Sequence, residues 1–301
     1  MIYINLGFPK TSSTNIQKYL YPKIKEINYI GRYYHKKNSK IFNQLNDYVE
    51  NRKLFSKNSL SKLKRLFKEL VKKNNTILLS NENWVIPYQK NNKTDKIEIV
   101  SQFEKLKRLR KFMNDINISY KFFIIDRDKS TLIKSLFATL QERITKLFGY
   151  KNLEFKNFID KFKQEDNDYE NIKLFFDIIN FKKIEKTLQK KIKIFNYNLI
   201  KNDPEKFLIH LGAFMNVKID ISLADKLRIK TRISESKNGN YIVKTPNFLF
   251  KLIKLMTPKK IKILLKKYSF YNKALSIMSN DTGVSYNNKK LKNFLEKIHK
   301  N

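Results

Sequence analysis

Residues 120–127 read YKFFIIDR, and this stretch decides the fold class. Aromatic and β-branched residues dominate it, as expected of a strand buried in a sheet. A helical pattern follows from about residue 130 to 147. A buried strand that leads directly into a helix is typical of a parallel sheet covered by helices.

The same alternation of strand and helix recurs along most of the chain. Short apolar runs predict further strands at 2–6, 27–30, 76–79 and 191–197. Helical periodicity predicts helices around 60–71, 103–113 and 155–188. Asp203 and Pro204 predict a helix start, with Asp as the N-cap and Pro at the first helical position. We therefore predict an α/β fold with three layers, in which helices flank a central parallel sheet.

The pattern changes after about residue 220. Residues 245–301 are expected to be wholly helical, and the last 51 residues hold 13 lysines against two acids. We predict a core at 1–220 and a basic, mainly helical C-terminal extension at 221–301, packed on the core within a single domain. The extension is either a solvated face or a peripheral contact with an anionic membrane.

Composition excludes several classes of protein. The 301 residues hold 64 Lys and Arg against 27 Asp and Glu, a formal charge of +37. Such a charge favours polyanion partners, but the lysines are spread through every predicted helix. Such a spread fits a solvated surface better than a dedicated binding stripe, and biased codon usage would produce it. Nucleic-acid binding is disfavoured, since no zinc-finger or basic-zipper spacing is present.

Cysteine and histidine are scarce. With no cysteine and three scattered histidines, no disulfide, thiol nucleophile or metal site is expected. No apolar stretch reaches the roughly 18 residues of a membrane span. The N-terminus, MIYINLG, lacks a basic leader and a signal-peptide apolar region. We therefore expect a cytoplasmic protein.

Residues 7–17 read GFPKTSSTNIQ and lie between the first predicted strand and a helix. Free backbone N–H groups and the positive end of the helix dipole make such a junction an anion site. Lys10 adds a full charge, and the hydroxyls of Thr11, Ser12, Ser13 and Thr14 can donate to phosphate oxygens. The GxxxxGK[ST] spacing of nucleoside-triphosphate loops is absent, which disfavours an ATPase or kinase of that class.

The segment PKTSST resembles the PK[ST]GTT phosphosulfate loop of sulfotransferases that use 3′-phosphoadenosine 5′-phosphosulfate (PAPS), in particular the bacterial and carbohydrate-type members. Lys10, Thr11 and Thr14 fall on the matching positions, while Ser12 and Ser13 replace the family's glycine and threonine. Serine lacks glycine's freedom at positive φ, so the departure at Ser12 bears on how well the loop holds the donor.

A second match lies at the strand YKFFII. The family's 3′-phosphate site is an arginine at the end of a central strand, followed eight residues later by a serine. Arg127 and Ser135 occupy these places. An arginine can clamp a phosphate through two charge-assisted hydrogen bonds, although Arg127 could instead form a salt bridge with Asp126 or Asp128. The resemblance implies a P-loop-like sulfotransferase architecture.

The resemblance also implies roles in catalysis. Lys10 would neutralise the departing oxygen of the donor, and Glu82, in SNENW, resembles the glutamate that accepts the acceptor's proton. Glu82 could instead be a capping residue, and His35 is the competing base. His210 is expected to be packed and His299 to lie on the terminal surface. Trp84 could line the acceptor groove or belong to the core.

Together these features imply a PAPS-dependent sulfotransferase with no metal. It would transfer a sulfuryl group to a hydroxyl (or amine) of a carbohydrate or glycolipid and release 3′-phosphoadenosine 5′-phosphate (PAP). The alternative is a non-catalytic basic module that binds nucleic acid or an anionic membrane. Such a module would not need Lys10, Arg127 and Ser135 together.

Overall fold

The computed structural model describes most of the chain, and all structural statements concern those residues. They are 1–7, 15–31, 36–52, 55–73, 76–90, 96–149, 154–164, 167–228, 236–237, 240–246, 279–284 and 286–299.

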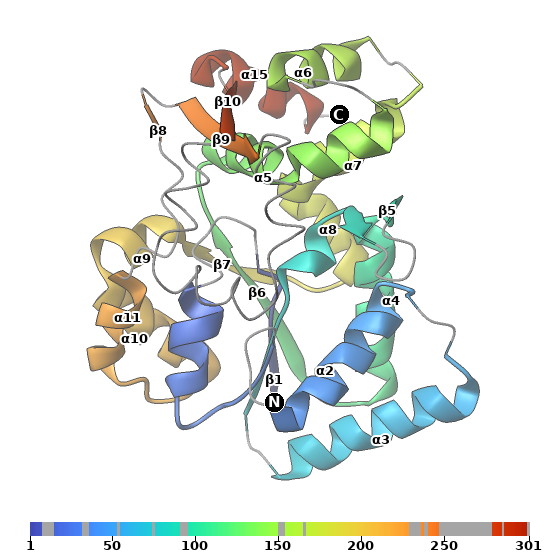
Figure 1. The fold of residues 1–301 in the computed structure, drawn as a ribbon. Coiled ribbons are helices and arrows are strands. Elements are labelled where there is room, and N and C mark those ends of the chain that lie inside the picture. Colours follow the sequence, from blue (N-terminus) through green and yellow to red (C-terminus); the bar gives the residue numbers. More distant parts are fainter. Residues whose placement is uncertain are drawn as a thin grey trace, which may run out of the picture.

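A five-stranded sheet forms the centre of the molecule (Figure 1). Its strands run in the order β2-β3-β1-β6-β7, and all four pairings are parallel. The strands are β1 (Ile2–Asn5), β2 (Asn28–Gly31), β3 (Ile77–Ser80), β6 (Tyr120–Asp126) and β7 (Ile192–Asn196). The α/β fold with a central parallel sheet is therefore confirmed.

Helices cover both faces of this sheet, because alternate strand residues are apolar on both sides. Tyr3, Leu78 and Phe123 face one helical layer, which is formed by the segments that come after β1 and β7 in the chain. That layer contains η1 (Ile16–Leu20), η2 (Tyr21–Lys23), α9 (Tyr197–Asn202), α10 (Pro204–Met215), η5 (Ile221–Leu223) and α11 (Ala224–Arg228).

Ile4 and Phe122 point to the opposite face of the sheet, into the larger part of the core. The helices that contribute side chains to this part of the core are α2 (Lys36–Val49), α3 (Lys57–Lys73), α4 (Gln102–Asp115), α5 (Lys129–Phe148), α6 (Phe155–Lys163), α7 (Tyr169–Phe176), η4 (Asp177–Ile179) and α8 (Phe181–Leu188). The three-layer arrangement predicted from the sequence is thus present.

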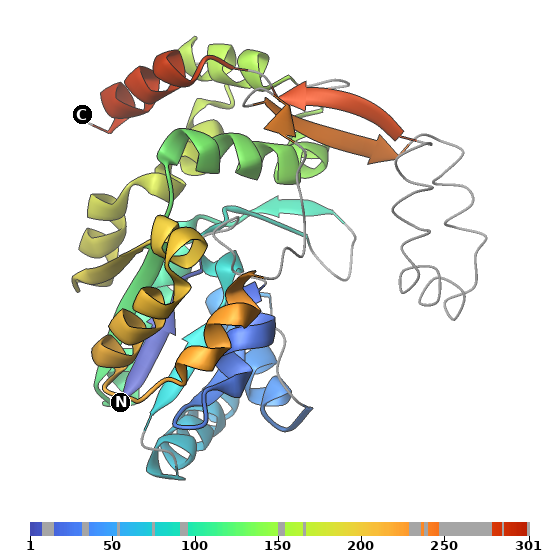
Figure 2. The same cartoon turned by 90° about the vertical axis from the view of Figure 1, so that its left-hand side faces the viewer.

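The strands end toward a further layer above the sheet, where α5, α6 and α15 (Asn288–Ile298) lie (Figures 1 and 2). Leu291 and Leu295 of α15 are buried, and the Phe294 ring lies 5.6 Å from the Phe162 ring and 5.3 Å from that of Phe176. The C-terminal helix therefore packs on the core.

The prediction of a wholly helical 245–301 is wrong. Residues 279–284 form β10 (Ser279–Val284), which pairs antiparallel with β9 (Asn240–Pro246), and β9 also pairs with β8 (Ser236–Lys237). The β-branched and aromatic residues of β9 favour an extended chain, and its partner strand lies more than 30 residues further along. Tertiary pairing of this kind overrides local helical periodicity. Residues 247–278, which hold much of the basic tail, lie outside the described residues.

A small hairpin and a short helix follow β3. The hairpin pairs β4 (Tyr88–Lys90) antiparallel with β5 (Ile97–Ile99), and the 3-10 helix η3 (Glu82–Val85) connects it to β3. This connection places Glu82 two residues beyond the carboxyl end of a central strand. Open α/β sheets bind ligands at that edge.

Candidate functional site

The segment predicted to be a phosphate loop begins directly after β1, at a turn that side-chain hydrogen bonds stabilise. The buried Asn5 side chain donates from Nδ2 to the Tyr21 hydroxyl at 2.7 Å, and its Oδ1 accepts from the Gly7 N–H at 2.9 Å. These bonds tie the strand, the turn and η2 together. Lys10, Thr11, Ser12, Ser13 and Thr14 lie outside the described residues.

Gly7 has a φ of +56°, a backbone conformation that favours glycine, and it lies close to the backbone of Glu82. A Cβ on Gly7 would lie 3.1 Å from the Glu82 N and 3.2 Å from the Glu82 Cα. The start of the phosphate loop and the turn that carries Glu82 are therefore in direct contact. The two segments are 75 residues apart in the sequence.

We expect Gly7→Ala to lower the free energy of unfolding by about 2–3 kcal/mol, because it adds a clash with backbone to the strain of a positive φ. Gly149→Ala is the matched control, since Gly149 has a φ of +70° but no atom within 4 Å of its Cβ position. It should cost only about 1 kcal/mol. Urea unfolding measures both values. Equal costs for the two variants would contradict the close contact between Gly7 and Glu82.

Glu82 is the first residue of η3, and it is half-buried. The N-cap is Asn81, whose Oδ1 accepts from the Asn83 N–H at 3.0 Å, and the Asn81 N–H donates to the Asn5 carbonyl at 3.4 Å. Because Asn81 caps the turn, the capping role considered for Glu82 belongs to its neighbour. The backbone of Glu82 instead lies against Gly7.

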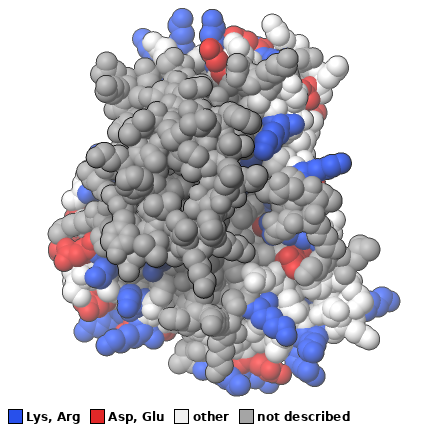
Figure 3. Space-filling view, viewed as in Figure 1, with Lys and Arg blue, Asp and Glu red and all other residues white. Residues whose placement is uncertain are grey.

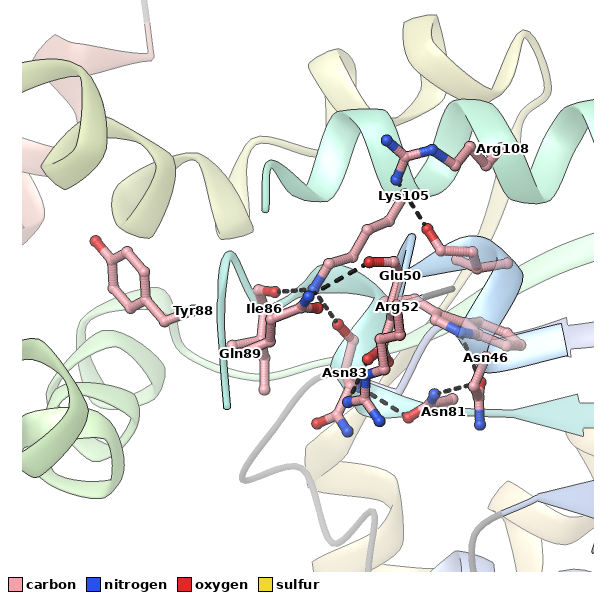
Figure 4. Close-up of polar contacts among 12 residues, drawn as sticks. Asn46, Glu50, Arg52, Asn81, Asn83, Ile86, Tyr88, Gln89, Lys105 and Arg108 are labelled. Atoms are coloured by element: carbon pink, nitrogen blue, oxygen red, sulfur yellow. Dashed lines mark hydrogen bonds and ion pairs between the residues drawn. The ribbon is translucent and has the colours of Figure 1, made fainter. Parts of the chain in front are cut away.

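Polar side chains from α2 and α4 form hydrogen bonds with this turn (Figure 4). Asn46 of α2 accepts on Oδ1 from the Asn81 Nδ2 at 2.8 Å and from the Trp84 Nε1 at 3.0 Å. Lys105 of α4 donates to the carbonyls of Asn83 at 3.2 Å and Ile86 at 2.8 Å. Trp84 is fully buried, so it belongs to the core. It does not line an exposed groove.

Arg127 follows β6 and is half-buried, with its guanidinium 5.3 Å from the centre of the Tyr197 ring. Asp128 caps α5, since its Oδ1 accepts from the Thr131 N–H at 2.8 Å and from the Thr131 hydroxyl at 2.6 Å. Burial raises the pKa of Asp126, while Lys129 lowers it. Arg127 therefore directly precedes the N-cap of α5, and its guanidinium lies near the Tyr197 ring.

Ser135 lies in the second turn of α5 and is buried. Arg127 and Ser135 therefore both belong to the β6–α5 junction, as the sequence predicts. β6 pairs directly with β1, so this junction and the start of the phosphate loop lie at the same edge of the sheet. No described contact joins Ser135 to Arg127.

The Asp126 Oδ1, at the end of β6, is buried without a hydrogen-bond partner among the described residues, and two polar donors at the same edge share this property. They are the Gln17 Nε2, on η1 just after the loop, and the Ser80 hydroxyl, at the end of β3. Buried donors of this kind are rare in proteins and call for an explanation. Both groups can donate, and a ligand rich in oxygen acceptors would satisfy them.

The two described histidines, His210 and His299, lie at different helices of the fold. His210 is exposed on α10, so the expectation that it is packed is wrong: the apolar stripe of that helix passes through Phe207, Leu208 and Leu211 instead. His299 is half-buried at the end of α15, where burial lowers its pKa. His35 lies outside the described residues.

Within the described part of the chain, no group of three or more His, Cys, Asp or Glu side chains is placed to hold a metal ion. Nor does that part contain a helix both long and apolar enough to cross a membrane. On the face in Figure 3, Lys and Arg side chains are scattered among acidic ones and form no single stripe in the described surface.

Fold and site together define an open α/β protein whose polar residues gather at the carboxyl edge of a parallel sheet. No protein-family model matches the sequence, and no curated protein matches it. Among solved structures, the chain is similar to the crystal structure of a sulfotransferase from Alicyclobacillus acidocaldarius, with 13% sequence identity and a TM-score of 0.45. The match covers 73% of this chain and 84% of that one. A likeness this distant assigns no activity.

Proposed function

We propose that this chain is a PAPS-dependent sulfotransferase that acts on a hydroxyl (or amine) of a carbohydrate or glycolipid and works in the cytoplasm. The observation that carries the proposal is the contact between Gly7 and Glu82. In this contact the backbone of Glu82, the residue that carries the candidate base, lies against Gly7, which precedes the segment that resembles a phosphosulfate-binding loop. Donor and acceptor chemistry would then meet at one point.

The donor would span two places at the carboxyl edge of the sheet. The loop residues Lys10 to Thr14 would hold its 5′-phosphosulfate, and Arg127 with Ser135 would hold its 3′-phosphate. The unpartnered donors of Gln17 and Ser80 suit such a ligand, because phosphate and sulfate oxygens are acceptors. A 3′-phosphate site would distinguish this donor from AMP and ATP.

In the proposed reaction, the bond between sulfur and the bridging oxygen of the phosphosulfate breaks, and a new bond forms between sulfur and the acceptor oxygen. Lys10 would neutralise the charge that develops on the departing oxygen. Glu82 would take the proton of the acceptor hydroxyl. The products are a sulfated acceptor and PAP. The carbohydrate acceptor follows from the resemblance of the Glu82 segment to carbohydrate-type members.

Calorimetric titration of the whole chain with PAP, with AMP as the control nucleotide, tests the donor site. We expect PAP to bind at least about 10-fold more tightly, because one additional charge-assisted phosphate contact contributes about 1.5–3 kcal/mol. A salt series distinguishes the alternative. If both nucleotides bind equally and lose affinity together as salt rises, the chain is a basic polyanion-binding module.

A further inference from the structure

Lys105 is a fully buried lysine on α4, and its side chain reaches η3, the turn that carries Glu82. Buried lysines are rare unless another group compensates their charge. Burial lowers the pKa of Lys105 to about 8, nearby Glu50 raises it, and the guanidinium groups of Arg52, Arg108 and Arg143 lower it further. The amine is therefore still mainly protonated at neutral pH.

The two hydrogen bonds of this amine reach both ends of one turn. The Nζ atom donates to the Asn83 carbonyl at 3.2 Å, inside η3, and to the Ile86 carbonyl at 2.8 Å, just after it (Figure 4). Asn83 also accepts from the Ile86 N–H at 3.3 Å, which closes the turn. A protonated amine bridging two carbonyls makes charge-assisted bonds, so it holds the turn more firmly than a neutral donor would.

The groups around Lys105 are themselves fixed. Glu50 is buried at the end of α2 and forms an ion pair with Arg52, and its carbonyl accepts from the Gln89 Nε2 at 3.3 Å. Arg108 donates to the Val49 carbonyl at 3.1 Å, which joins α4 to α2. The buried ammonium therefore sits in a rigid frame. Such frames hold functional side chains in place.

We propose that Lys105 is a positioning residue that sets the place of Glu82 relative to the donor loop. This inference rests on the proposed sulfotransferase function. Lys105 holds residues 83–86, Asn46 holds Asn81 and Trp84, and Gly7 touches Glu82 from the loop side. The backbone around Glu82 is thus held by α4, by α2 and by Gly7. Removing the ammonium frees the turn on the side of α4.

The variant Lys105→Met tests the proposal, with Lys107→Met as its matched control. Lys107 lies on the same helix with its side chain exposed, and it pairs with Glu104. The double variant Lys105→Met with Glu50→Gln also removes the nearby buried carboxylate, whose charge the Lys105 ammonium helps to balance. Circular dichroism verifies that each variant is folded.

Trp84 is the single tryptophan of the chain and lies in the same turn as Glu82, so its fluorescence reports on the turn directly. We expect Lys105→Met to shift Trp84 emission to longer wavelength and to increase its quenching by acrylamide at least about 2-fold. Sulfuryl transfer, followed as PAP formation from PAPS with mixed oligosaccharides, should fall about 100-fold in kcat. The KM for PAPS and the affinity for PAP should stay within about 2-fold, and Lys107→Met should match the unaltered chain.

The outcomes separate the two proposals. If the unaltered chain does not prefer PAP over AMP, the proposed function fails, whatever Trp84 reports. If PAP binding is selective but Lys105→Met keeps its kcat, the positioning proposal is overturned. It is also overturned if kcat and PAP affinity fall together, or if neither the single nor the double variant folds, because Lys105 then supports the whole structure and not the turn.

Discussion

Replacing Glu82 by glutamine is expected to lower kcat for sulfuryl transfer by about 100- to 10,000-fold, the usual contribution of a general base. Glutamine keeps the size of the side chain but cannot accept the acceptor's proton. Because Asn81, and not Glu82, caps η3, the turn should keep its shape in the variant. PAP formation from PAPS with mixed oligosaccharides measures the effect, and calorimetry should show unchanged PAP affinity.

The control for this variant is Glu104→Gln, which removes an exposed carboxylate on α4 that pairs with Lys107. It should leave the rate unchanged. If Glu82→Gln keeps the rate within about 3-fold of the unaltered chain, Glu82 is not the base. The same assay on His35→Asn would then examine the competing base predicted from the sequence.

Replacing Arg127 by methionine is expected to weaken PAP binding by about 10- to 100-fold and to leave AMP binding nearly unchanged. A hydrogen bond between charged groups contributes about 1.5–3 kcal/mol, and each 1.4 kcal/mol corresponds to a factor of ten. Arg127→Lys should retain part of the affinity, because lysine keeps the charge but not the planar fork. Calorimetric titration with both nucleotides at one salt concentration measures these changes.

Arg65→Met is the charge-matched control for Arg127→Met. Arg65 is exposed on α3 and pairs with Glu69, so its removal lowers the net charge by the same amount away from the candidate site. It should leave PAP affinity within about 2-fold. An equal loss in both variants would mean that the general field of the protein, and not a phosphate clamp, attracts the nucleotide.

Elements with local signals are predictable from the sequence. The helix α10 begins at Pro204 as expected, because Asp203 caps it by accepting from the Lys206 N–H at 3.0 Å. The strand β6 is predictable because it contains a continuous apolar run, Phe122, Phe123, Ile124 and Ile125. Successive residues point to opposite faces of the sheet, so the run makes both faces apolar, as a central parallel strand requires. α2 has weaker local signals, since Asn and Asp separate its buried residues Phe42, Leu45 and Val49.

The candidate site is predictable only in part. Glu82 and Arg127 stand out because each follows a predicted strand. Asn5 and Asn46 do not, although an asparagine within the apolar run of β1 is a signal that could have been followed. Lys105 does lie on the buried face of α4, three residues after Gln102 and four before Leu109. Among 64 Lys and Arg residues, that spacing alone is not distinctive.

The periodicity and the capping residues of the sequence determined the α/β class and the order of most strands and helices. They also determined that polar residues follow the ends of β3 and β6. These properties depend on neighbours within a few positions, so the sequence alone contains them. Tertiary structure alone decided that Gly7 meets Glu82, that Lys105 is buried, and that 240–246 pairs with 279–284. Burial and strand pairing depend on which distant segments cover a residue, and nothing local specifies those segments.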